Sequence, residues 1–266
     1  MKSNIGAQLI RRAREKDAAM AGIASVEPLK KTPSHKILSM NTGLEIEDFA
    51  GISWPEDARS ALVVAVSHPE DEPELDWWDD KGSPGNNILI RIIRELSLWV
   101  QEEYGINTHE MPYAVERGGI YVKDTAVLAG LGCIGRNNLL ITPKLGPRVR
   151  LRAVLLSEEL PPTGPISFDP CDGCEEFCRK ACPQNAFAER VLSSSDVGMA
   201  SFPGRDGFFS RAKCFIQMNK DAGESGVDMD DDVHLVLDSE EEFNMDDRLS
   251  HIKYCRRCEL SCPVGK

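Results

Sequence analysis

The chain has 266 residues, is 41% hydrophobic and carries a formal net charge of −12 from 43 acidic and 31 basic side chains. This length suffices for one large or two modest domains, and no stretch is long and apolar enough to span a bilayer. Because an acidic surface repels phosphate backbones, we do not expect nucleic acid as a partner.

Three segments of the first hundred residues have the periodicity of regular structure. Apolar side chains at near-helical spacing predict an amphipathic helix over residues 5–24, with a short strand at 22–26. The apolar, β-branched run from Ala61 to Ser67 predicts a buried strand. Residues 87–103 predict a long helix. The N-terminus lacks the apolar core of a signal peptide, so we expect a reducing, cytoplasmic location.

Two polar segments lie around these elements. Residues 30–41 are basic and predict a surface loop or the start of a helix. Residues 68–86 are rich in Pro, Asp and Gly and contain the pair Trp77-Trp78. The tryptophan pair is interpreted either as a lid over a flat cofactor or as the aromatic anchor of a loop.

A glycine-rich segment follows a predicted helix at residues 122–129. Gly130, Gly132 and Gly135 permit close approach of the backbone to a ligand, and residues 151–156 predict a strand. The G-x-G-x-x-G spacing follows a helix rather than a strand, so the dinucleotide-binding interpretation lacks its required context.

Two cysteine runs dominate the C-terminal third. The first is Cys171-Asp-Gly-Cys174-Glu-Glu-Phe-Cys178-Arg-Lys-Ala-Cys182-Pro183, and the second is Cys255-Arg-Arg-Cys258-Glu-Leu-Ser-Cys262-Pro263. Closely spaced cysteines that end in Cys-Pro are typical of [4Fe–4S] ferredoxins. The chain has nine cysteines, and Cys214 between the runs is the natural eighth ligand of two clusters.

Crossing the terminal cysteines, as in two-cluster ferredoxins, predicts two sets of four ligands. One set is Cys171, Cys174, Cys178 and Cys262, and the other is Cys182, Cys214, Cys255 and Cys258. The first run has three residues between its second and third cysteines where ferredoxins have two, which leaves a [3Fe–4S] cluster open. Zinc sites and disulfides are the alternatives, but neither needs four cysteines in one run.

The glycine segment from Ala129 to Pro143, followed by residues 146–151, resembles the signature of epoxyqueuosine reductases and cobalamin-dependent reductive dehalogenases. The order of the cysteines is also similar, so the resemblance covers about residues 50–266. It implies an α+β protein: a nitroreductase-like α/β cofactor-binding domain at 1–165, and a double-cluster ferredoxin-like domain at 166–266.

The resemblance further implies a base-off cobalamin that the clusters reduce. Gly130, Gly132, Cys133 and Gly135 would then line the corrin, and Arg148 would bind its amides or a substrate carboxylate, as would Arg150. Cys133 stands where the family has a tryptophan, and burial as a small hydrophobe is the interpretation we favour over cobalt ligation or redox activity. Structural ion pairs are the alternative for both arginines.

The proton donor of the family has no clear counterpart. Asp124, Glu116 and Tyr121 are the candidates, with Lys123 beside them, although an ordinary exposed helix face is the favoured interpretation of Asp124 and Lys123. Epoxyqueuosine reductases continue into a domain that helps to hold tRNA, whereas this sequence ends four residues after Cys262. With the acidic charge, this predicts a substrate other than epoxyqueuosine in tRNA.

The resulting expectation is an iron–sulfur oxidoreductase that reduces a bound cobalamin and, through it, a small or protein-borne substrate. A low-potential ferredoxin or flavodoxin would supply the electrons. The alternatives are an electron-transfer protein that activates the corrinoid of a partner, and a reductase that holds a flavin. The acidic runs at 228–232 and 240–242 are expected to be a solvated insertion.

Overall fold

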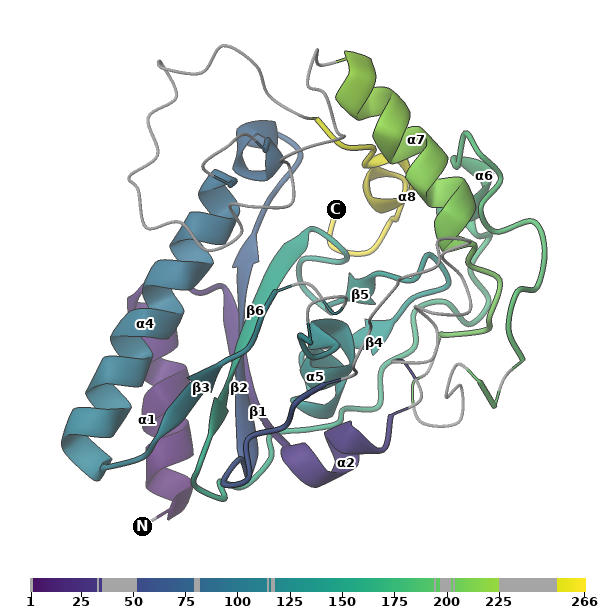
Figure 1. Ribbon diagram of the computed structural model, residues 1–266. Helices are drawn as coiled ribbons and strands as arrows, with labels where there is room; N and C mark the ends of the chain where they lie inside the picture. Colours follow the sequence, from purple (N-terminus) through teal and green to yellow (C-terminus); the bar gives the residue numbers. More distant parts are fainter. Residues whose placement is uncertain are drawn as a thin grey trace.

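A four-stranded antiparallel sheet lies at the centre of the computed structural model, with strands in the order β1-β2-β6-β3 (Figure 1). The structure describes residues 2–32, 34, 52–78, 82–113, 115, 118–193, 195–196, 202, 204–224 and 253–266. The sheet strands are β1 (Met20–Ser25), β2 (Ser60–Ser67), β3 (Thr108–Glu110) and β6 (Val149–Leu156). A separate hairpin consists of β4 (Cys133–Ile134) and β5 (Leu140–Ile141).

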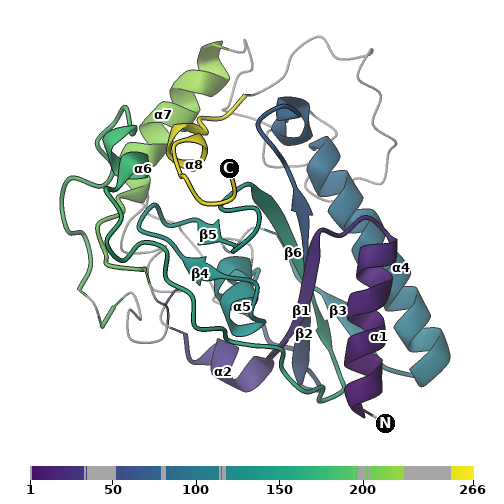
Figure 2. The same cartoon turned by 180° about the vertical axis from the view of Figure 1, so that it is seen from behind.

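Helices cover both faces of the sheet (Figures 1 and 2). One face packs against α1 (Lys2–Glu15) and α4 (Pro84–Tyr104), and the other against α2 (Val26–Lys30) and α5 (Val122–Leu128). A 3-10 turn, η1 (Pro73–Asp76), packs against α4. Each face has its own apolar core. The described sheet pairs are all antiparallel, so α+β is the correct class, and α/β in the parallel sense does not apply to the N-terminal part.

The central strands and the long helix agree with the sequence predictions. Strand β2 pairs with β6 from Ser60 to Ser67, and its apolar side chains are buried because both sheet faces are covered. Helix α4 begins where the Ser83 hydroxyl accepts a hydrogen bond from the N–H of Asn86 at 3.3 Å. It ends at Gly105, whose φ of 64° gives the left-handed conformation that glycine adopts without steric cost.

The predicted helix over residues 5–24 was too long. Helix α1 ends at Glu15, Asp17 has a positive φ of 72°, and strand β1 begins at Met20. Residues 20–25 pair with β2, in register from Met20↔Ala65 onward. Strand pairing therefore replaces the last two turns of the expected helix, and the predicted short strand is present but begins two residues earlier.

Among its described residues, the cysteine-rich region has the helices α6 (Phe177–Lys180), α7 (Arg211–Glu224) and α8 (Arg257–Leu260). They lie together on the far side of the β4–β5 hairpin from α4, with α6 packed on α8 (Figures 1 and 2). A small apolar cluster joins this region to the hairpin, because Cys133 and Ile141 pack with Cys171 and Cys262. The boundary between residues 165 and 166 stays a prediction.

Several sequence predictions fall outside the described residues. These are most of the loop at 30–41, the acidic runs at 228–232 and 240–242, and Glu116. None of the helices in the described part of the chain has the length and apolar character that a membrane crossing needs.

Candidate metal centre

Eight cysteines of the C-terminal region form two neighbouring groups. The first group comprises Cys171, Cys174, Cys178 and Cys262, and the second comprises Cys182, Cys214, Cys255 and Cys258. All are free thiols. The pKa of Cys178 is raised to about 11. Burial is the largest cause of this shift, and the thiols of Cys171 and Cys262 also contribute to it.

The second group shows the same mutual effect. Burial raises the pKa of Cys214 to about 11, with further contributions from Cys182 and Cys255. Burial also raises the pKa of Cys258. Among the neighbouring thiols, Cys214 and Cys255 raise this pKa more strongly than Cys178, which belongs to the first group. The thiols thus interact mainly within the two sets that the crossed pairing predicts. The pairing itself remains a proposal.

Main-chain N–H groups point at several of these sulfurs. The N–H of Arg136 donates to Cys171 Sγ at 3.5 Å, and the N–H of Ala186 donates to Cys182 Sγ at 3.4 Å. Hydrogen bonds from the main chain also lower the thiol pKa of Cys178, Cys255 and Cys262, against the larger effect of burial. Such donors stabilise negative charge on sulfur, as the thiolate ligands of an iron–sulfur cluster require.

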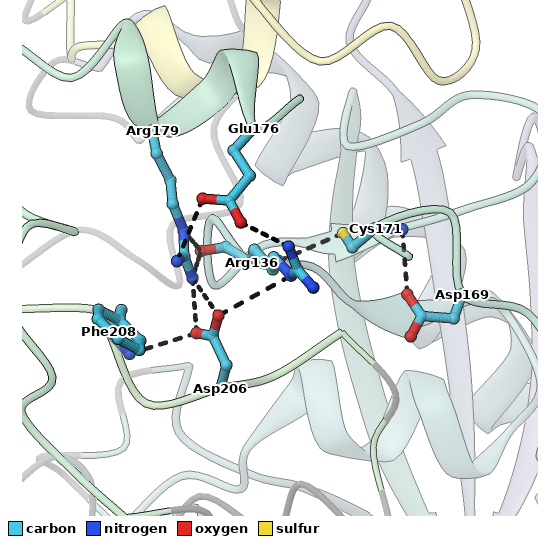
Figure 3. Close-up of polar contacts among 7 residues, drawn as sticks. All are labelled: Arg136, Asp169, Cys171, Glu176, Arg179, Asp206 and Phe208. Carbon is cyan, nitrogen blue, oxygen red and sulfur yellow. Dashed lines mark hydrogen bonds and ion pairs between the residues drawn. The ribbon is translucent and has the colours of Figure 1, made fainter. Parts of the chain in front are cut away.

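An ionic network holds the first cysteine loop against the N-terminal part of the chain (Figure 3). Arg136 pairs with Glu176 at 2.5 Å, and Arg179 binds both carboxylate oxygens of Asp206 at 2.6 and 2.7 Å. The Arg179 guanidinium also donates twice to the carbonyl oxygen of Arg136, at 3.0 and 3.1 Å. The peptide group of Arg136 thereby contacts both a thiol and the helix that carries Cys178.

The extra residue in the first run takes a left-handed conformation. Glu176, which precedes α6, has a φ of 58°, and Gly173 has a φ of 69°. The left-handed residue Glu176 lies within the longer segment between Cys174 and Cys178, and Gly173 directly precedes this segment. The same Glu176 pairs with Arg136, which compensates for the cost of its backbone conformation.

A cavity of about 380 Å³ adjoins the second cysteine group. All four cysteines of that group line it, together with Tyr121, Lys123 and residues 137–139 of the hairpin loop. The Lys123 ammonium donates to the carbonyl oxygen of Asn138 at 2.6 Å, and burial lowers the pKa of Lys123 to about 8. Four phenyl or phenol rings complete the wall: Phe187, Phe209, Phe215 and Tyr254.

The arrangement suits a cluster with thiolate ligands. It offers soft sulfur donors in two sets of four, peptide N–H groups aimed at sulfur, and a cavity beside the second set. Within the described residues, no three Cys, His, Asp or Glu side chains lie close enough together to hold a single metal ion.

The candidate proton donors lie in different environments, because some line the cavity and one is buried in an ion pair. Tyr121 and Lys123 line the cavity. Asp124 is 0% exposed and its Oδ1 accepts a hydrogen bond from Arg205 at 2.7 Å, so the interpretation as an exposed helix face was wrong for this residue. No local pattern indicates this pair, because its members are separated by 81 positions.

The predicted cofactor-binding glycines pack against the chain itself. A Cβ at Gly132 would meet the carbonyl oxygen of Ile141, and one at Gly135 would meet the Ile141 side chain. Gly130, at a φ of 76°, lies against residues 163–164. These positions require glycine for close packing within the protein, and their contact with a corrin stays a prediction.

The other two predicted cofactor contacts are also occupied by protein. Cys133 is buried, as the small-hydrophobe interpretation requires, and burial raises the pKa of its thiol to about 12. Arg148 donates to the carbonyl oxygens of Cys262 and Val264, at 3.5 and 2.5 Å. This arginine therefore fixes the C-terminal segment on the sheet.

A buried charged cluster beside the sheet includes Arg150, for which a structural ion pair was the alternative interpretation, whereas its partners in the cluster were not predicted. Arg150 pairs with Asp76 and lies over the Trp78 ring at 4.9 Å. His68 Nε2 lies 3.7 Å from Glu259, which accepts from Arg256 at 2.5 Å. The residues of this cluster come from distant parts of the chain. The only sign of the cluster in the sequence was the alternation of arginines at positions 148, 150 and 152. Trp78 here acts as the anchor of a loop.

Burial is the main reason why the pKa of His68 is lowered to about 3, and the positive charges of Arg256 and Arg150 lower it further. The Trp77 ring faces the Lys253 ammonium at 4.2 Å. Both tryptophans thus contact cations of this chain.

Comparisons with known proteins place the chain in context, although no family model matches it. It is 27% identical over 212 residues to the epoxyqueuosine reductase of Synechococcus sp. (strain RCC307), across 70% of this chain and 62% of that protein. It is 43% identical over 88 residues to a tetrachloroethene reductive dehalogenase of Dehalobacter restrictus, across 29% of this chain and 15% of that protein. The solved epoxyqueuosine reductase of Streptococcus thermophilus superposes with a TM-score of 0.64 at 18% identity, covering 98% of this chain and 66% of that one.

These similarities relate the chain to both groups of reductases, and its fold is that of an epoxyqueuosine reductase. The chain spans less than two thirds of the length of each of these three proteins.

Proposed function

We propose that this relative of the epoxyqueuosine reductases and reductive dehalogenases is an iron–sulfur oxidoreductase with two [4Fe–4S] clusters. The observation that carries the proposal is that eight thiols influence one another mainly within two sets of four, with main-chain N–H groups aimed at sulfur. The first cluster would be held by Cys171, Cys174, Cys178 and Cys262, and the second by Cys182, Cys214, Cys255 and Cys258.

The clusters would supply one-electron transfer at low potential. The residues of this chain would hold the thiolates, exclude water and set the local charge. The Arg136 peptide donates to Cys171, while aromatic rings such as Phe187 and Phe215 shield the second group. Free thiols throughout the C-terminal region suit a reducing, cytoplasmic setting.

The electron donor would be a low-potential ferredoxin or flavodoxin, and the acceptor a small or protein-borne substrate. The relation to reductases supports an acceptor bound by the N-terminal part. Since the net charge is −12, we do not propose nucleic acid as the substrate.

Cobalamin is the cofactor that the resemblance implies, but the residues assigned to it do not fit that assignment in this structure. The glycines pack against the chain, Cys133 is a buried residue of the hairpin, and Arg148 binds the C-terminal segment. The uptake of cobalamin, like that of flavin, is a question for direct measurement.

A second candidate function is electron transfer to the corrinoid of a partner protein, without a substrate of its own. The state of Asp124 favours it, because the carboxylate is sealed from solvent and bound to Arg205 rather than open to a substrate. If the protein is a reductase, another residue would have to donate the proton in place of Asp124. Tyr121 and Lys123, which line the cavity, are the candidates.

The test is the metal content of protein purified without oxygen and then offered hydroxocobalamin or flavin. Two clusters predict about eight irons per chain, and Cys214→Ala should lower this number because it removes a ligand of the second cluster. Fewer than about seven irons in the unaltered protein would contradict the two-cluster proposal. One bound cobalt would support a cobalamin reductase, and full iron without cobalt or flavin would favour the electron carrier.

A further inference from the structure

The hairpin loop from Arg136 to Asn138 lies between the two cysteine groups. Arg136 donates its main-chain N–H to Cys171 Sγ of the first group at 3.5 Å. The next residue, Asn137, donates its side-chain amide to the carbonyl oxygen of Cys258, in the second group, at 3.4 Å. The carbonyl oxygen of Asn138 accepts from Lys123 at 2.6 Å. Three consecutive residues thus connect both groups and one ammonium.

Several charges beside the first group are paired with one another. Two arginines and two carboxylates form the network of Figure 3, and each guanidinium has a carboxylate partner: Arg136 binds Glu176, and Arg179 binds Asp206. These pairs neutralise each other at short range, while Arg148, bound to the carbonyl oxygen of Cys262, is a further positive charge that favours the thiolate of this ligand.

Beside the second group, the hydrogen-bond acceptor of the Lys123 ammonium is a carbonyl oxygen. Its neighbour Asp124 is bound to Arg205, and no carboxylate of the described residues forms an ion pair with the Lys123 ammonium. Lys123 and Arg211 both favour the thiolate of Cys214. Other charges act on the remaining ligands of this group: Arg257 favours and Asp221 disfavours the thiolate of Cys255, and Glu259 disfavours that of Cys258.

We propose that Lys123 raises the reduction potential of the second cluster, because its ammonium stabilises the negative charge that this cluster gains with an electron. This inference rests on the two-cluster function proposed above. The step is a one-electron reduction by an external low-potential donor, with no bond made or broken. Reduction adds one negative charge to the cluster, and a nearby ammonium stabilises that charge.

Lys123 is better placed for this role than a cation at the edge of the cavity would be. It projects from the first turn of α5 into the cavity that the four thiols line, and the Asn138 carbonyl holds its ammonium in place. Low polarity around the cavity, which four aromatic rings provide, keeps the interaction strong. The negative charge of a bound cluster in turn favours the charged form of the lysine.

The experiment is a redox titration of the full chain at neutral pH without oxygen, followed by electron paramagnetic resonance. Lys123→Met removes the charge, whereas Lys123→Gln removes it but keeps a hydrogen-bond donor. Lys213→Met is the matched control, because Lys213 directly precedes Cys214 but pairs with Glu189 at 3.4 Å and is more than a third exposed. The resonance that changes in Cys255→Ser identifies the second cluster.

At a fixed ambient potential, we expect both Lys123 variants to lower the reduced-to-oxidised ratio of the second cluster about tenfold, which equals 59 mV for one electron. The ratio of the first cluster, and both ratios in Lys213→Met, should change less than about twofold, or 18 mV by the same relation.

The result separates this inference from the proposed function. If the unaltered protein lacks two clusters, the proposed function fails. If both clusters are present and the second keeps its potential in Lys123→Met and Lys123→Gln, the charge of Lys123 does not act on it and the inference is wrong. Loss of the second cluster in both variants would also overturn the inference, because Lys123 would then be needed for assembly rather than for potential.

Discussion

The ion pair between Asp124 and Arg205 provides a direct test of whether Asp124 is structural or catalytic. Asp124 is 0% and Arg205 5% exposed, and Arg205 also donates to the Ser34 hydroxyl at 2.5 Å. Arg205→Met would leave the Asp124 carboxylate buried without its positive partner. Removing one member of a buried pair costs about 3–5 kcal/mol.

At about 2–4 °C per kcal/mol, this cost predicts a melting temperature lower by roughly 6–20 °C in Arg205→Met. Asp124→Leu combined with Arg205→Met should recover most of the loss, because an apolar pair of similar volume replaces the ionic one. The measurement is thermal unfolding followed by circular dichroism, without oxygen and with iron content matched among the variants.

A different outcome would refute the structural assignment. If Asp124→Asn kept the melting temperature within about 1 °C and yet abolished reduction of a substrate, Asp124 would be the proton donor that the family resemblance implies. The buried pair would then be a resting arrangement that opens during turnover.

Three further predictions concern the hairpin, the ninth cysteine and pH. Gly132→Ala should destabilise the protein by about 1–3 kcal/mol in denaturant unfolding, because a Cβ meets the Ile141 carbonyl, whereas Gly223→Ala, with nothing within 4 Å, should not destabilise it. Cys133→Ala should retain about eight irons by metal analysis, and a loss of about four would make Cys133 a ligand. His68, with its pKa lowered to about 3, binds a proton more weakly in the folded than in the unfolded state. The unfolding free energy should therefore fall as the pH drops below about 6.5, by at most about 1.4 kcal/mol per pH unit, and less steeply in His68→Asn.

The sequence predicted those elements whose pattern admits one interpretation. Strand β2 was expected at 61–67 and runs from 60 to 67, because a short apolar run with β-branched residues suits a strand covered on both faces. Helix α4 was predicted at 87–103, and its capping serine and glycine extend it to 84–104. For these segments, local pattern and tertiary burial agree.

Predictions failed where a distant partner decides the structure. The apolar residues from Ala18 to Ala24 fit a helix and a strand equally well, and pairing with β2, 35 to 45 residues away, selects the strand. Asp124 at a helix start resembles a solvated residue until Arg205 is placed against it. Because no local pattern encodes either partner, single-sequence reasoning had no signal for them.

The cysteine groups depend on the N-terminal part of the chain more closely than a two-domain division suggests. The peptide of Arg136 donates to Cys171, and Asn137 binds the carbonyl of Cys258. Arg148, which directly precedes β6, fixes the carbonyls of Cys262 and Val264. Hence, the hairpin loop and the start of β6 supply donors to both cysteine groups. A chain divided at residue 165 would lose these donors and expose the apolar contact of Cys133 with its neighbours. These contacts position both cysteine groups on the N-terminal part of the chain, and the division into two domains stays a prediction.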